Sequence, residues 1–95
     1  MTSPLIEICV QRNGARAWAE VSIDSNKRLA TSKKLIMMEL GVTDPIDEVT
    51  LWKVDGVGEL VKLEDWRPVK DQISDGDRVV VKVEPISREI FAPGA

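Results

Sequence analysis

The sequence is poor in the residue types on which most enzyme chemistry depends. Its 95 residues include no histidine, no tyrosine, one phenylalanine and one cysteine. Histidine is the most frequent general base and a common metal ligand, and without it Cys9 has no partner to activate it as a nucleophile. A lone cysteine cannot form an internal disulfide, which is typical of a reducing compartment. We therefore predict that the protein is not an enzyme and has no catalytic residues.

The motifs that bind metals or cofactors are also missing. Asp71, Asp75 and Asp77 are close in the sequence, but they lack the Asp-x-Asp-x-Asp-Gly spacing and the distal glutamate of a calcium loop. An aspartate before Gly76 is typical of a tight turn, which explains Asp75 without a cation. The Gly-Val-Gly segment at 56–58 has neither the lysine nor the helix start of a phosphate-binding loop. We expect no metal, no cofactor and no small-molecule substrate.

Membrane and nucleic-acid partners are disfavoured by hydropathy and charge. No apolar run reaches the roughly 18 residues of a transmembrane helix, and the N-terminus lacks the regions of a signal peptide. The 13 basic and 16 acidic residues give a net charge of −3, whereas nucleic-acid binders usually carry a basic excess. We therefore expect a cytoplasmic protein that binds neither nucleic acid nor membranes.

The sequence does contain a clear change of hydrophobic period, first in its N-terminal half. Alternation of apolar and polar residues predicts strands near 5–11 and 16–23, joined by a tight turn at Asn13-Gly14. A following stretch without glycine or proline predicts an amphipathic helix over about 26–40. Asp24, Ser25 and Asn26 are the candidate N-caps, and Gly41 is the expected left-handed C-cap.

Strands return in the C-terminal half. Alternation predicts strands at 49–54 and 78–83, and a short strand near 60–63. We expect Ile73 to be buried in the segment that leads back to the last strand. The pattern stops after Glu84, so residues 1–84 are predicted to form one domain and residues 85–95 a flexible tail or linker. The predicted core comprises Ile6, Ile8, Val10, Val21, Leu29, Ile36, Leu40, Leu51, Val79 and Val81.

This order of elements resembles the ubiquitin-like β-grasp family. The resemblance covers roughly Leu5 to Val83 and lies in the Asn13-Gly14 hairpin, the helix ending at Gly41, the segment 51–56 and the crossing segment 69–73. It implies an α+β fold in which a mixed sheet of four or five strands packs on one helix, with the first and last strands parallel and central. Val49-x-Leu51-Trp52 followed by Leu60-Val61-x-Leu63 is similar to the ubiquitin-like header of Crinkler-type effectors and to the N-terminal ubiquitin-like domain of a trypanosomatid cytoskeletal scaffold.

The resemblance implies a non-catalytic module that binds another protein or peptide. We expect the N-terminal domain of a larger scaffold or cytoskeletal protein, with a cytoskeleton-associated location. Ras-binding and PB1-type modules are an alternative, in which Arg12 and Arg16 would face an acidic partner. Conjugated modifiers and sulfur carriers end in two glycines, whereas this sequence contains no Gly-Gly pair, so that function is the less favoured alternative. Fold alone does not decide between these functions.

The predicted partner-binding site is built around Trp52. If Leu51 points into the core, Trp52 must point to the opposite face of its strand, and tryptophans are enriched at interaction hot spots. Basic side chains from the helix, including Lys33, form a second candidate feature, although a solvated helix face is the better explanation for them. The predicted partner-binding residues are Trp52, Val54, Lys53, Val80, Lys82 and Trp18.

Overall fold

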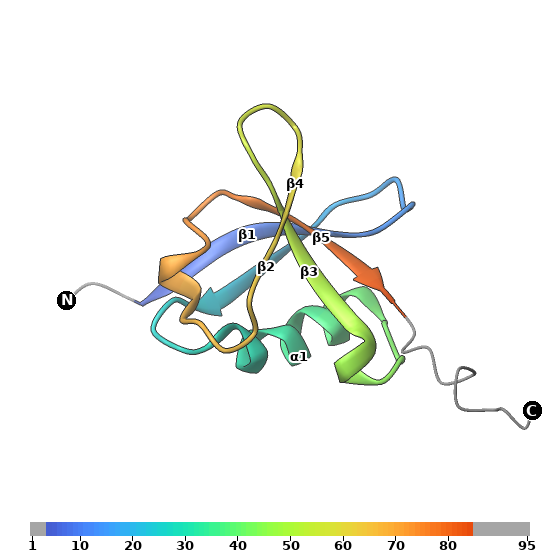
Figure 1. Ribbon diagram of the computed structural model, residues 1–95, viewed down its shortest axis with the longest axis horizontal. Coiled ribbons are helices and arrows are strands. Elements are labelled where there is room, and N and C mark those ends of the chain that lie inside the picture. Colours follow the sequence, from blue (N-terminus) through green and yellow to red (C-terminus); the bar gives the residue numbers. More distant parts are fainter. Residues whose placement is uncertain (1–3, 85–95) are drawn as a thin grey trace, which may run out of the picture.

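The computed structural model describes residues 4–84, which form five strands, one α-helix and two short 3-10 helices (Figure 1). The predicted tail at 85–95 lies outside these residues. In chain order the elements are β1 (Leu5–Arg12), β2 (Ala19–Asp24), α1 (Leu29–Leu40), η1 (Ile46–Glu48), β3 (Val49–Val54), β4 (Leu60–Lys62), η2 (Val69–Asp71) and β5 (Arg78–Val83).

The strands form one mixed sheet in the order β2-β1-β5-β3-β4. β1 and β5 are parallel neighbours at its centre, with Val10 opposite Val79, and the other neighbouring pairs are antiparallel. Helix α1 packs on one face of the sheet, and no helix of residues 4–84 covers the opposite face (Figure 1). The predicted parallel pairing of the first and last strands is therefore confirmed.

The core lies between α1 and the sheet and is built mainly from aliphatic side chains. Eight of the ten predicted core residues are buried, whereas Ile6 and Leu40 are only partly buried because they lie near the ends of β1 and α1. Ile73 is buried as predicted. The described core cluster consists of Ile8, Val10, Val21, Ile23, Leu29, Ile36, Met37, Val42, Val49, Leu51, Leu63, Val69, Ile73, Val79 and Val81.

The predicted turn at Asn13-Gly14 is present, since the Ala15 amide donates a hydrogen bond to the Arg12 carbonyl at 2.8 Å, but the turn does not join the first two strands directly. β2 begins at Ala19 rather than near residue 16, and residues 13–18 form a longer connection. The physical reason is that the Asn13 amide donates a hydrogen bond to the Val81 carbonyl at 2.8 Å, so β1 continues along β5 beyond its pairing with β2. Gly14, with φ of 91°, turns the chain at the residue that follows this bond.

The N-terminus of α1 also differs from the prediction, because the helix begins at Leu29. None of the candidate caps serves it: the Asp24 carboxylate accepts a hydrogen bond from the Asn26 amide, and Arg28 occupies the N-cap position without a side-chain bond. The first helical amides, those of Leu29 and Ala30, instead donate to the carbonyls of Arg67 and Asp65, both at 3.0 Å. A distant loop therefore caps the helix.

The C-terminus of α1 ends as predicted. Gly41 adopts the left-handed conformation with φ of 69° and ψ of 26°. The next amide, that of Val42, donates to the Met37 carbonyl at 2.9 Å. This pattern satisfies carbonyls that the last helical turn would otherwise leave unpaired.

Replacement of Gly41 by alanine is expected to lower the free energy of unfolding by about 1 kcal/mol, because a Cβ atom disfavours positive φ. The site is otherwise open, since an added Cβ would meet nothing within 4 Å. Gly56→Ala is the matched control, because Gly56 is equally open and its φ is not positive. Urea denaturation of both variants measures the effect, and equal stabilities would contradict the expectation.

The open edge of the sheet at β4 is followed by an unusual side-chain contact. The Gln72 amide nitrogen donates to the Glu64 carbonyl at 2.8 Å, and the Glu64 amide donates to the Gln72 amide oxygen at 2.6 Å. A single side chain thus satisfies both backbone groups of Glu64, two residues beyond β4.

Candidate interaction surface

The candidate site lies on the sheet face opposite α1, which we call the outer face. Val49 and Leu51 on β3 and Val79 and Val81 on β5 are fully buried against the helix. Because side chains alternate along a strand, their neighbours project to the outer face. These outward residues are Thr50, Trp52 and Val54 on β3, and Arg78, Val80 and Lys82 on β5.

Val80 and Trp52 occupy the centre of the outer face. Val80 lies in register with Gln11 on β1 and with Trp52 on β3. It is only 7% exposed although it does not belong to the core cluster, so its neighbours on the outer face must cover it. Trp52 is half-buried, and its indole nitrogen donates to the Thr50 hydroxyl at 2.9 Å. The centre is therefore a small, fixed apolar layer.

Each of the two tryptophans on this face has a cationic side chain over its ring. The Lys82 ammonium lies 4.5 Å from the Trp52 ring centroid, and the Arg78 guanidinium carbon lies 5.7 Å from that of Trp18. Trp18 stands just before β2 and is 40% exposed. A cation over an aromatic ring is attracted by the negative face of the ring, so these contacts hold the two cations above the sheet.

The outer face over β5, β3 and β4 is basic. Lys62, the register partner of Trp52 on β4, joins Arg78 and Lys82 there. Within residues 4–84 none of these three cations forms an ion pair. The apolar floor beside them includes Val54 and its register partner Leu60, both half-buried. We call this area, made of Trp52, Val54, Leu60, Lys62, Arg78, Val80 and Lys82, the basic half.

The outer face over β1 and β2 carries the opposite charge. Glu7 and Glu20 line a hollow of about 130 Å³ there, together with Cys9 and Asp75. The Asp75 carboxylate accepts a hydrogen bond from the Glu7 amide at 2.8 Å. We call this area, made of Glu7, Cys9, Glu20 and Asp75, the acidic half. The outer face is thus divided by charge across its strands: it is acidic over β1 and β2 and basic over β5, β3 and β4.

The structure brings most of the predicted partner-binding residues together. Trp52, Val54, Val80 and Lys82 share the outer face, and Trp18 lies beside Arg78 at its margin. Val80 is buried rather than exposed, because Trp52 and Gln11 flank it.

Lys53 does not belong to this group. Its ammonium forms an ion pair with Asp77 at 3.3 Å, and strand alternation directs it away from Trp52. Arg78 was missed, although the same alternation that selected Val80 and Lys82 pointed to it.

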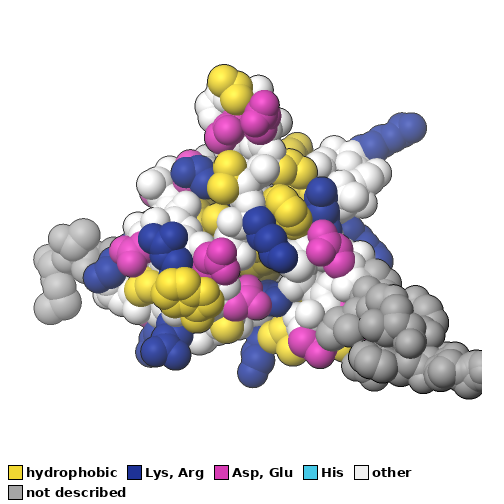
Figure 2. All heavy atoms as spheres, in the orientation of Figure 1, with side chains coloured by type: hydrophobic (Ala, Val, Ile, Leu, Met, Phe, Trp, Pro, Cys, Tyr) yellow, Lys and Arg dark blue, Asp and Glu magenta, His cyan; other side chains and the backbone are white. Residues whose placement is uncertain are grey.

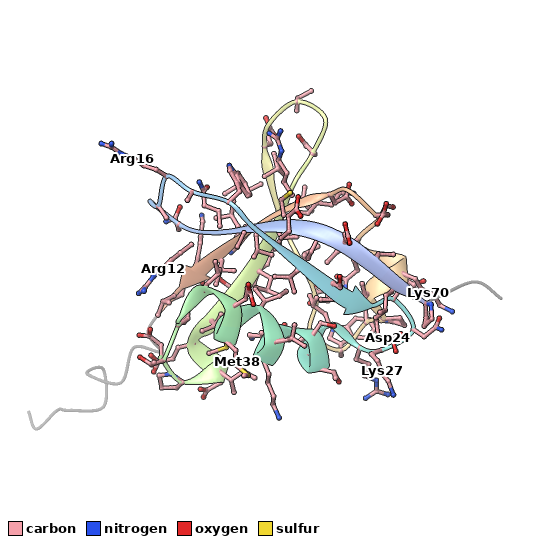
Figure 3. All side chains as sticks on the ribbon, turned by 180° about the vertical axis from the view of Figure 1, so that it is seen from behind. Arg12, Arg16, Asp24, Lys27, Met38 and Lys70 are labelled. Atoms are coloured by element: carbon pink, nitrogen blue, oxygen red, sulfur yellow. The ribbon has the colours of Figure 1, made fainter. Side chains whose placement is uncertain are left out.

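The basic residues considered as a second feature do not converge. Lys33 is only 2% exposed and forms an ion pair with Asp65 at 2.8 Å. Arg12 and Arg16 lie at the end of the molecule opposite to Lys27 (Figure 3). Figure 2 shows basic, acidic and apolar side chains interspersed over the face in view. The helix therefore contributes a solvated surface rather than a basic patch.

Other kinds of site find little support in residues 4–84. No group of three or more histidine, cysteine, aspartate or glutamate side chains is placed there to hold a metal ion. None of the helices in this range has the length and apolar character needed to cross a membrane.

A central parallel β1–β5 pair, antiparallel flanking strands and a single helix across one face define the ubiquitin-like β-grasp fold. Solved structures share it. The C-terminal ubiquitin-like domain of mouse tubulin-specific chaperone e has a TM-score of 0.75 and 18% identity, covering 92% of this chain and 94% of that one. A ubiquitin-like domain from tubulin-binding cofactor B has a TM-score of 0.72 and 20% identity, with 86% and 92% covered.

Tubulin-binding cofactor B of Trypanosoma brucei is also similar, with a TM-score of 0.70 and 13% identity over 87% of this chain and 99% of that one. At these identities the likeness establishes the fold. No protein-family model and no curated protein sequence matches the chain.

Proposed function

We propose that this chain is a non-catalytic interaction module that binds another protein through the basic half of its outer face. The observation that carries the proposal is a sheet face that no helix of residues 4–84 covers, with two tryptophans that each lie under a cation. Tryptophan and arginine are enriched at interaction hot spots. An apolar floor with a charged rim is the usual anatomy of such a surface.

We further propose that the module belongs to a larger scaffold or cytoskeletal protein. Support comes from the structural neighbours, which include ubiquitin-like domains of a tubulin-specific chaperone and of tubulin-binding cofactor B. Their names refer to tubulin, and the sequence resembles a cytoskeletal scaffold domain. Purified tubulin is therefore the first partner to test, by titration calorimetry with the full chain.

Trp52→Ala is expected to weaken binding of the partner by about 2 kcal/mol, or about 30-fold, because it removes the central ring and the platform of Lys82. The same change uncovers Val80, so thermal melts must show that the variant is folded at the assay temperature. Trp66→Ala is the matched control, since Trp66 is 68% exposed and lies in the loop after β4, outside the basic half.

Two results would contradict the proposal that the basic half is the contact surface. Equal losses in the Trp52 and Trp66 variants would show that the basic half is not the contact surface. Loss of binding in Arg12→Gln or Arg16→Gln, with Trp52→Ala unaffected, would favour the Ras-binding or PB1-type alternative, which uses the hairpin end.

A further inference from the structure

We infer that the basic half recognises an acidic segment of the partner, which lies extended alongside β5. In this segment two carboxylate side chains flank one aliphatic residue. This inference rests on the proposed function and specifies the chemistry of its partner. It is argued from the charges, the spacing and the fixed positions of the side chains on the outer face.

The first argument is that the three cations of the basic half have no carboxylate partner within residues 4–84. The described ion pairs use Arg12, Lys33 and Lys53. Arg78, Lys82 and Lys62 form none, although the chain as a whole has three more acidic than basic residues. A desolvated contact surface with unpaired cations is best matched by carboxylates of a partner.

The second argument is that these cations are held in place before a ligand arrives. Lys82 and Arg78 lie over the rings of Trp52 and Trp18. A guanidinium or ammonium group over a ring still presents N–H donors outward. The Trp52 indole nitrogen is already bonded to Thr50, so the ring contributes apolar surface while the cations supply the hydrogen bonds. Less ordering on binding favours affinity.

The third argument is spacing. Arg78 and Lys82 stand four residues apart on the same face of β5 and flank Val80. At about 3.3 Å per residue this separation is roughly 13 Å, which an extended peptide reproduces with carboxylates four residues apart. The residue midway between them would lie over the apolar centre. The sequence pattern Glu-x-Leu-x-Glu is the simplest that fits.

The acidic half limits where such a segment can lie. Glu7 and Glu20 would repel carboxylates that crossed onto β1 and β2. The bound segment must therefore lie alongside β5 and β3, and the acidic half disfavours a ligand that is placed elsewhere on the outer face. The same carboxylates disfavour a polyphosphate backbone, which would spread negative charge over the whole face.

The test titrates the 95-residue chain with the peptide acetyl-Gly-Glu-Gly-Leu-Gly-Glu-Gly-amide at low salt, and NMR spectra of the chain monitor the binding. We expect saturable shifts confined to the amides of β5 and β3 and to the Trp52 indole. A peptide with lysine in place of both glutamates should bind at least about tenfold more weakly. Arg78→Gln and Lys82→Gln should each weaken binding about three- to tenfold, whereas Glu20→Gln should leave it unchanged or tighten it.

Several outcomes would overturn the inference. The first is that the lysine peptide binds as tightly as the glutamate peptide. The second is that the Arg78→Gln/Lys82→Gln double variant binds the glutamate peptide as tightly as the unchanged chain does. The third is that a ten-nucleotide oligothymidine displaces the glutamate peptide as well as unlabelled peptide does. Concentration-dependent dimerisation abolished by both Glu20→Gln and Lys82→Gln would assign the surface to a second copy instead. If Trp52→Ala weakens tubulin binding but the double variant does not, the proposed function stands and this inference fails. Peptide binding without tubulin binding would support this inference and exclude tubulin as the partner.

Discussion

Replacement of Ile36 by alanine is expected to lower the free energy of unfolding by about 2–5 kcal/mol. Ile36 is 0% exposed and lies in the middle of α1, among the side chains between the helix and the sheet. Removing its three outer carbon atoms loses apolar burial and leaves a cavity, because a close-packed core relaxes only partly. Urea denaturation monitored by tryptophan fluorescence measures the change.

Met38→Ala is the matched control for this prediction. Met38 belongs to the same helix but is 81% exposed and points away from the sheet (Figure 3). Its replacement should change the stability by no more than about 0.5 kcal/mol, as is usual for surface substitutions. A similar loss in both variants would mean that helix formation, rather than packing, controls the effect.

Replacement of Asp65 by alanine is expected to lower the free energy of unfolding by about 3 kcal/mol, the lower end of the range for breaking a buried ion pair. The Lys33 side chain is 3% exposed, whereas that of Asp65 is 47% exposed. Losing the carboxylate leaves the ammonium buried without its counter-charge. The loop carbonyl that caps Ala30 is also loosened, because it belongs to the same residue.

The partner substitution Lys33→Met should behave differently, although it breaks the same ion pair. It replaces a buried charge with an apolar chain of similar length and leaves only a half-exposed carboxylate, so the stability should change by less than about 1 kcal/mol. In the double variant, Lys33→Met should recover most of the loss caused by Asp65→Ala. Equal losses in the two single variants would show that the ion pair itself, rather than the stranded charge, determines the stability.

The elements that depend on local pattern could be predicted from the sequence, and those that depend on distant partners could not. Hydrophobic period located the strands and the helix, and Gly41 marked the helix end. The start of α1 is set by carbonyls of Asp65 and Arg67, and the start of β2 by the bond from Asn13 to Val81. Both are contacts between residues far apart in the sequence, which periodicity cannot reveal.

The candidate site shows the same division. Strand alternation placed Trp52 on the outer face once Leu51 was assigned to the core, and the same rule applied strictly would have excluded Lys53 and included Arg78. The burial of Val80 and the pairing of Arg78 with Trp18 depend on the order of strands in the sheet. That order was implied by resemblance, while the register that aligns the side chains was not.

The contact between Gln72 and Glu64 has a consequence for how the molecule behaves at high concentration. The exposed edge of a sheet can pair with a strand of another molecule and begin aggregation. Here one side-chain amide occupies the donor and acceptor that a neighbouring strand would use at Glu64. With β4 only three residues long, the remaining edge is too short to template a stable ladder. The amide of Gln72 therefore hinders intermolecular strand pairing at the β4 edge of the sheet, without a bulky covering element.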